Sequence, residues 1–213
     1  MARSILPATV STTVVVITGL LLAPLFEFRS LPTHMALHIG LMNVAAPLMA
    51  AVLVHRIGSG GRAARLWLIA AVQIVLLWAW HAPALQQQTA YSHLLQWVMH
   101  GSLFLVALCW HGLLRLPAAV RWQAIPVLLL TGKLACLLAA LLIFAPRVLY
   151  ISPHADAAHW AIVTLEDQQL AGLLMITACP LSYLVAGVVF AAQAIAAFGA
   201  PRREMTSSGR QAA

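Results

Sequence analysis

Charged side chains are scarce in this chain, which has five acidic residues and a single lysine among its 213 residues. Charged residues make up 8% of the sequence, whereas a soluble domain carries about 25%. This shortage excludes an ordinary soluble domain. It also leaves no paired carboxylates, no Ser/His/Asp arrangement and no phosphate-binding loop that would support hydrolytic or phosphoryl-transfer chemistry. We therefore predict that the protein is not an enzyme.

Cysteine is also rare, since the chain has only Cys109, Cys136 and Cys179. All three lie within hydrophobic segments and none belongs to a CxxC pair, which argues against a structural disulfide or a redox motif. Buried thiols most often act as small hydrophobic side chains, and ligation of Cu(I) is the alternative. No basic run with interleaved aromatic residues is present, so the net charge of +7 does not indicate nucleic-acid binding.

Hydrophobic residues are abundant instead, at 62% of the sequence with a mean hydropathy of +0.92. A helix needs about 20 apolar residues to cross the hydrocarbon core of a bilayer. We predict an all-α fold, a polytopic membrane helix bundle with six transmembrane helices embedded in the lipid bilayer. A single transmembrane helical domain covers residues 1–200, and a flexible cytoplasmic tail covers 201–213. The expected helices are 7–26, 32–54, 64–85, 92–114, 122–146 and 168–198.

Arginine indicates the orientation of these helices, because basic residues concentrate in cytoplasmic loops. Nine arginines fall at one end of the expected helices, whereas the other end holds only Arg29 and Arg147, and Lys133 lies inside a helix. Both termini are therefore predicted to be cytoplasmic. The expected outer loops are 27–31, 86–91 and 147–167.

Seven of the nine histidines lie at the outer, arginine-poor end of the helices. Histidine is the commonest metal ligand among side chains. His34 and His38 are four residues apart, which places both rings on one helix face about 6 Å apart along the axis. Such a pair can bind one metal ion through two nitrogens. The seven residues are His34, His38, His81, His93, His100, His154 and His159.

Histidines on two further helices are expected at a similar depth. His81 ends the third helix, while His93 and His100 share one face of the fourth, with His100 well inside the hydrocarbon. For any single histidine, a neutral ring hydrogen-bonded to a neighbouring helix is the simpler interpretation. Five histidines from three helices at one depth favour a metal site instead. His154 and His159 are either residues of a solvated outer loop or a capture site for the metal.

Methionines near these histidines offer soft sulfur donors, which select Cu(I). We interpret Met35, Met42 and Met99 as auxiliary ligands, with filling of the core as the alternative. Lys133 has two interpretations. Its stem can snorkel to the cytoplasmic interface, or its ammonium group can be the counter-ion of an anionic ligand such as a haem propionate.

Four motifs resemble the signature of a known family. They are His34-Met35-x-x-His38, Trp80-His81-x-Pro83, the His93/His100 pair, and the stretch Leu165-Glu166-Asp167-Gln168-Gln169-Leu170-Ala171-Gly172-Leu173-Leu174-Met175, which follows Tyr150. Over roughly residues 30–190 the chain resembles the multi-spanning CtaG family of cytochrome c oxidase assembly proteins. The Asp-Gln-Gln-x-Ala-Gly stretch is the most specific part of this resemblance.

The resemblance implies a role in maturation of a haem–copper oxidase in the bacterial inner membrane, with an oxidase subunit as partner and copper as the metal. It implies Asp167 and Gln168 as functional positions beside the histidines. Asp167 would either cap the last helix or accept a hydrogen bond from a ligating histidine. The implied ligands are His34, His38, His81, His93 and His100.

Two other functions fit the same residues. A b-type membrane cytochrome would bind haem b through axial histidines of two helices, with Lys133 or Arg147 near the propionates. A metal-free scaffold would hold an oxidase subunit during insertion. A Soret band in the purified protein would favour the cytochrome, and oxidase maturation by a His34→Ala/His38→Ala variant at limiting copper would favour the scaffold.

Overall fold

The computed structural model describes residues 30–53, 62–114, 122–150 and 163–199, which form helices joined by short connections. Among these residues there is no β-strand, which confirms the all-α prediction. The helices in chain order are α2 (Leu31–Gly40), η2 (Leu41–Ala45), α3 (Ala46–Leu53), α4 (Arg62–Trp80), α5 (Pro83–Thr89), α6 (His93–Leu113), α7 (Ala124–Phe144) and α8 (Leu165–Gly199).

Four helical stretches in the described ranges are long and apolar enough to cross a membrane. They are Leu31–Ala51, His93–Leu113, Ala124–Phe144 and Leu165–Ala196, and the bent pair Ala64–Trp80 and Pro83–Thr89 makes a fifth if it is one span. These correspond to five of the six expected helices.

The expected helix at 7–26, the tail at 201–213 and both termini lie outside the described residues. The total of six transmembrane helices and the cytoplasmic location of both ends therefore stay predictions.

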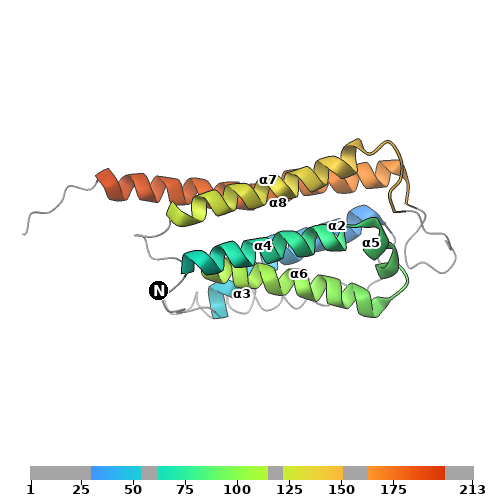
Figure 1. The fold of residues 1–213 in the computed structure, drawn as a ribbon, viewed down its shortest axis with the longest axis horizontal. Coiled ribbons are helices and arrows are strands. Elements are labelled where there is room, and N and C mark those ends of the chain that lie inside the picture. The colour runs from blue at the N-terminus through green and yellow to red at the C-terminus, as the bar shows by residue number, and fades with distance from the viewer. Residues whose placement is uncertain (1–29, 54–61, 115–121, 151–162, 200–213) are drawn as a thin grey trace, which may run out of the picture.

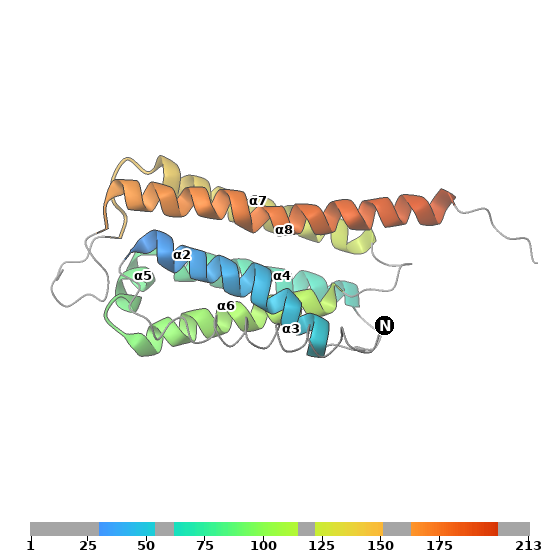
Figure 2. The ribbon, with the colours of Figure 1, turned by 180° about the vertical axis from the view of Figure 1, so that it is seen from behind.

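The helices form two layers (Figures 1 and 2). In one layer α7 and α8 lie side by side along most of their length. In the other, α6 packs against α3 and α4, and the layers are joined where α2 contacts α8 and α4 contacts α7. Apolar side chains of both layers fill the space between them, so the inner face of each helix is buried and the outer face is available to lipid.

The third expected helix differs from the prediction, because it ends at Trp80 and does not continue to residue 85. The chain turns by 72° and resumes as the short helix α5. Pro83 explains the break, since proline has no N–H for the helical hydrogen-bond pattern but is well suited to the first position of a new helix. His81 lies in this turn, and the bend fixes its position.

The second expected helix contains a π-helical turn, η2, that the periodicity of the sequence did not indicate. Pro47 follows two residues after this turn and cannot donate a backbone hydrogen bond into it. Asn43 of the turn accepts a 2.7 Å hydrogen bond from the hydroxyl of Ser182 in α8. The irregular turn is thus fixed against the neighbouring layer.

Gly172 lets α7 and α8 approach closely. A β-carbon at this position would lie 2.7 Å from Cγ1 of Ile143 and 3.0 Å from the carbonyl oxygen of Ala139. Both distances are shorter than van der Waals contact, so only glycine fits without movement of α7. Small residues at such a contact let two membrane helices approach closely.

We expect Gly172→Ala to destabilise the protein by about 1–3 kcal/mol, because the added methyl group overpacks the α7–α8 contact. Gly101→Ala is the matched control, since Gly101 is also helical but its added carbon meets no atom within 4 Å. That control should gain stability, because alanine favours helix over glycine by about 1 kcal/mol. Thermal unfolding in detergent compares the two, and equal melting temperatures for the variants would contradict the account.

Candidate metal centre

Four histidines are buried together at one end of the bundle. The exposed fractions of the side chains are 3% for His34 and 4% each for His38, His81 and His100. α2 carries the first two, the turn after α4 carries His81, and α6 carries His100. The structure thus brings together four of the five histidines that the sequence singled out, from α2, α6 and the turn after α4.

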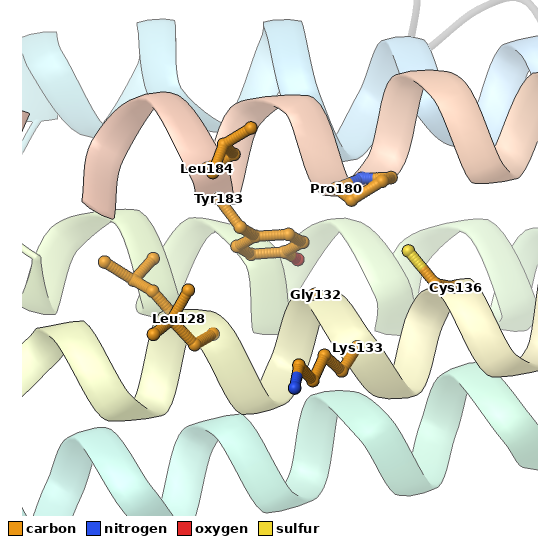
Figure 3. A pocket seen from close by; sticks show the side chains of 8 residues that line it. Leu128, Gly132, Lys133, Cys136, Pro180, Tyr183 and Leu184 are labelled. Carbon is orange, nitrogen blue, oxygen red and sulfur yellow. The ribbon is translucent and has the colours of Figure 1, made fainter. Parts of the chain in front are cut away.

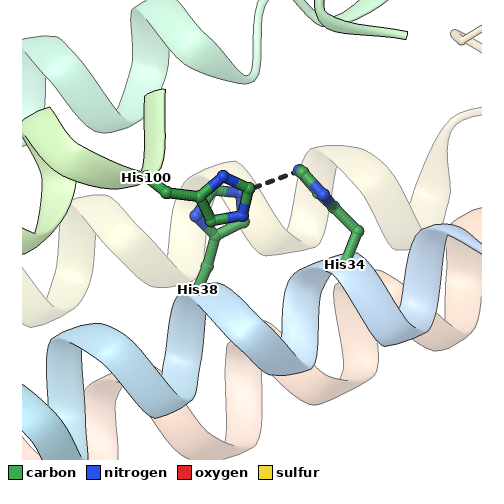
Figure 4. Close-up of side chains that lie close together, drawn as sticks. All are labelled: His34, His38 and His100. Carbon is green, nitrogen blue, oxygen red and sulfur yellow. Dashed lines mark hydrogen bonds between the residues drawn. The ribbon is translucent and has the colours of Figure 1, made fainter. Parts of the chain in front are cut away.

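The rings of three of them are close enough to share one ion (Figure 4). One ring nitrogen from each of His34, His38 and His100 lies within 4.8 Å of the other two. The Nε2 atoms of His34 and His38 are 2.9 Å apart and share a hydrogen bond. His38 and His100 are stacked with ring centroids 4.5 Å apart and an interplanar angle of 7°. The i, i+4 spacing therefore brings both α2 histidines to a single point, as predicted.

The hydrogen bonds of His100 decide which of its nitrogens is free to bind a metal. Its Nδ1 lies 2.7 Å from the carbonyl oxygen of Gln96. A carbonyl only accepts, so Nδ1 carries the proton and Nε2 carries the lone pair. Nε2 is buried and has no hydrogen-bond partner, and the same holds for Nδ1 of His38. Buried ring nitrogens without partners are rare, and a neutral imidazole with a free lone pair is a metal donor, so these residues fit a bound metal ion.

His81 shows the same arrangement. Its Nδ1 donates to the carbonyl oxygen of Leu77 at 2.7 Å, so Nε2 again carries the lone pair. That nitrogen faces the sulfur of Met35 at 3.3 Å. Two electron-pair donors thus point at each other with no proton between them. The His81 ring lies beside the other three, with its centroid 5.8 Å from that of His38.

The remaining predicted ligands lie elsewhere or outside the described residues. His93 is exposed at the first residue of α6 and does not belong to the buried group. Met42 and Met99 are buried in the hydrophobic core that surrounds the histidines. His154 and His159 lie outside the described residues.

Asp167 and Gln168 support the site from the start of α8. Oδ2 of Asp167 accepts a hydrogen bond from the backbone N–H of Thr164 at 3.3 Å, and Oγ1 of Thr164 accepts one from the N–H of Asp167 at 3.0 Å. This reciprocal pair is a helix cap. Of the two roles considered for Asp167, the structure thus shows the cap.

Gln168 is fully buried and ties α8 to the end of α7. Its Oε1 accepts a hydrogen bond from the N–H of Leu149 at 2.7 Å. Its Nε2 donates to the carbonyl oxygens of Leu142 at 3.2 Å and Arg147 at 3.4 Å. One amide side chain therefore satisfies three backbone groups where α7 ends and the following loop begins.

This loop reaches the histidines through Tyr150, a contact that sequence reasoning missed. The phenol of Tyr150 donates a 3.0 Å hydrogen bond to the carbonyl oxygen of His81. Burial raises the pKa of this phenol above its ordinary value, which keeps it protonated and able to donate. The chain of contacts runs from Gln168 through the Leu149–Tyr150 segment to the backbone of His81.

If the histidine cluster binds a metal ion, replacing Tyr150 by phenylalanine should weaken that binding by about 10-fold, the lower end of the effect seen when a residue that orients a ligand is lost. The ring remains, and only the hydrogen bond to His81 disappears. Tyr183→Phe is the control, because that phenol accepts a hydrogen bond from Gln73 of α4 and contacts no histidine backbone. Competition with a Cu(I) chelator measures both affinities, and an unchanged affinity in Tyr150→Phe would refute the positioning role.

The two cationic residues considered as counter-ions do not belong to the buried histidine cluster. Lys133 is exposed on α7, and Arg147 is exposed in the loop that follows α7. In the described part of the chain, no aspartate or glutamate is buried with the histidines. The four rings therefore form a neutral donor set inside an apolar bundle.

The fold and the cluster together define a multi-pass helical membrane protein with a buried group of imidazole donors at one end. The family model described as cytochrome c oxidase caa3 assembly factor, Caa3_CtaG, matches residues 8–197. The chain therefore belongs to this family, as the sequence motifs indicated. Comparison with curated proteins and comparison with solved structures both find no match.

Proposed function

We propose that this protein binds Cu(I) at His34, His38, His81 and His100 and delivers it to a haem–copper oxidase during assembly. Membership of the assembly-factor family supports the oxidase as client. The observation that carries the metal role is the pair of buried, unpartnered nitrogens, Nδ1 of His38 and Nε2 of His100. Copper is then a cargo, and the protein needs no catalytic base.

The neutral donor set supports Cu(I) over Cu(II). No carboxylate compensates the charge of the bound ion, and an uncompensated charge is costly in an apolar interior. A single positive charge costs less than two. The sulfur of Met35, next to His81, is a soft donor that also prefers Cu(I).

The packing of the rings supports copper over haem b. An axial pair of histidines must enclose the macrocycle between the two rings. His38 and His100 are instead stacked at 4.5 Å, which leaves no room for a porphyrin between them. A Soret band in the purified wild-type protein would overturn this choice.

The proposed location is the bacterial inner membrane, with the histidines toward the outer face. His34 lies three residues from the start of α2, which is about 5 Å along the helix axis. Copper therefore has a short path from the outer interface to the cluster.

Oxidase maturation at limiting copper tests the delivery role directly. A cell that carries His34→Ala/His38→Ala in place of the wild-type protein should assemble oxidase that lacks copper, and added copper should restore it. Full maturation in that variant at limiting copper would favour a metal-free scaffold instead. Immunodetection of the variant in the membrane controls for loss of the protein.

A further inference from the structure

A groove lies between α7 and α8, and no histidine lines it (Figure 3). Its volume is about 170 Å³. Lys133 is the one charged residue of a largely apolar lining, and the buried ring of Tyr183 lies between α8 and α7 (Figure 3). The lining residues are Leu128, Leu129, Gly132, Lys133, Cys136, Pro180, Tyr183 and Leu184.

Lys133 places a positive charge near the middle of a membrane span. It lies nine residues after Ala124 and eleven before Phe144, which is about 14 and 17 Å from the two ends of α7. Its side chain is exposed on the outside of the bundle. An ionisable group at this depth is costly in hydrocarbon and marks a functional position by default.

The described part of the chain offers Lys133 no nearby carboxylate. Its only acidic residues, Glu166 and Asp167, are in the first turn of α8. Gly132 packs against Pro180 and Tyr183, so these carboxylates lie about 20 Å away along α8. The described residues therefore supply no counter-charge for Lys133.

A second copy of the chain is not expected to supply it either. The acidic residues of the whole sequence fall at the expected helix ends, in the outer loop or in the tail, and none falls in the middle of an expected helix. They are Glu27, Asp156, Glu166, Asp167 and Glu204. Charge complementarity thus points to a different protein.

The size of the groove indicates what kind of group enters it. A cavity of about 150 Å³ holds one benzene ring, whereas pockets for larger ligands measure about 300–1,000 Å³. The groove suits one or two side chains of an adjacent helix and is too small for a haem. The small side chain of Cys136 allows a neighbouring backbone to come close.

We propose that this groove docks a transmembrane helix of the client oxidase whose aspartate or glutamate pairs with Lys133. The proposal rests on the proposed function only in taking the oxidase as partner. The apolar part of the docking helix fills the space beside Leu129 and Leu184, both about half exposed. Its carboxylate pairs with the ammonium group of Lys133. A lone charge facing lipid is costly, so pairing the two charges stabilises the complex.

Site-specific photo-crosslinking in cells that assemble the oxidase tests this docking. A photoreactive amino acid replaces Leu184 in the groove, and the control position is Leu105, which is equally exposed on α6. Mass spectrometry then identifies the crosslinked peptide. The Leu184 probe should capture an oxidase helix with an acidic residue within about one helical turn of the crosslink, and the Leu105 probe should not.

Variants of Lys133 test the charge itself. Lys133→Met should lower the crosslink yield by about 3- to 15-fold, the range expected for one polar contact between membrane helices, and Lys133→Arg should retain it. Exchange of charges, Lys133→Asp with a lysine at the captured carboxylate, should restore the yield.

Several results would overturn the proposal. Crosslinks confined to lipid, to residues 7–26 of this chain, to a second copy or to an oxidase helix without an acidic residue would each do so. A crosslink yield that is unchanged in Lys133→Met would do so as well. The same crosslink measured with His34→Ala/His38→Ala separates docking from copper delivery, because docking does not require the histidines. Loss of copper binding with an intact crosslink would then affect only the proposed metal role.

Discussion

Simultaneous replacement of His34 and His38 by alanine should lower the affinity of the purified protein for Cu(I) by at least about 100-fold. Loss of a residue that only orients a ligand already costs about 10- to 100-fold, and this variant loses two donors. The remaining histidines, His81 and His100, come from different helices and cannot replace the i, i+4 pair. The protein should still fold, because helix packing depends mainly on the apolar core around the cluster.

Competition with a Cu(I)-specific chelator measures this change, and His93→Ala is the control. His93 belongs to the same sequence motif as His100 but is exposed at the start of α6. Its removal should change the affinity by less than the removal of any buried histidine. An equal loss in His93→Ala, or an unchanged affinity in the double variant, would show that the metal is bound elsewhere.

Replacement of Gln168 by leucine should destabilise the protein by about 3 kcal/mol or more, because three backbone groups lose their partner in a buried place. For a chain of this length that corresponds to a fall in Tm of about 6–12 °C. The N–H of Leu149 and the carbonyl of Leu142 would both be left without a hydrogen bond. The variant should also bind Cu(I) more weakly, since the Leu149–Tyr150 segment positions His81.

Gln169→Leu provides the matched control for this prediction. Gln169 is the next residue and donates a single 3.3 Å hydrogen bond to the carbonyl oxygen of Ile143. It is only half-buried, so its replacement should cost about 1 kcal/mol. If both variants melt at the same temperature, Gln168 does not hold the loop as described.

The sequence allowed prediction of the features that depend on composition and helical periodicity. Apolar length located five expected helices that the structure contains, and the four-residue spacing placed His34 and His38 on one face. Counting along each helix placed His81 and His100 near the end of the bundle that carries His34 and His38. These inferences succeed because each depends only on the apolar composition of a segment or on the spacing of residues along one helix.

The features that escaped prediction depend on contacts between distant parts of the chain. The 72° turn at His81 is one, since the run of apolar residues indicated a helix to residue 85 and not a change of direction after Trp80. Tyr150 is another, because 69 residues separate it from the carbonyl that it contacts. Only the assembled bundle shows that His93 faces outward while His100, on the same helix, faces the cluster.

The structure also gives a physical reason for the most specific part of the family motif. Within residues 167–172, Asp167 caps α8, Gln168 ties the loop to α7, and Gly172 allows the two helices to touch. The hydrogen bonds of Asp167 and Gln168 go to the backbone of α7, of the loop that follows it and of Thr164. The motif therefore holds α7, α8 and the loop between them in place, and the histidines supply the candidate metal donors.

X-ray absorption spectroscopy of the protein loaded with one Cu(I) tests the central claim most directly. The account predicts scattering from at least three imidazole rings around a single copper, because His34, His38 and His100 meet at one point. The number of rings should fall in the His34→Ala/His38→Ala variant. A coordination shell made of sulfur alone, or one with fewer than two imidazoles in the wild-type protein, would contradict it.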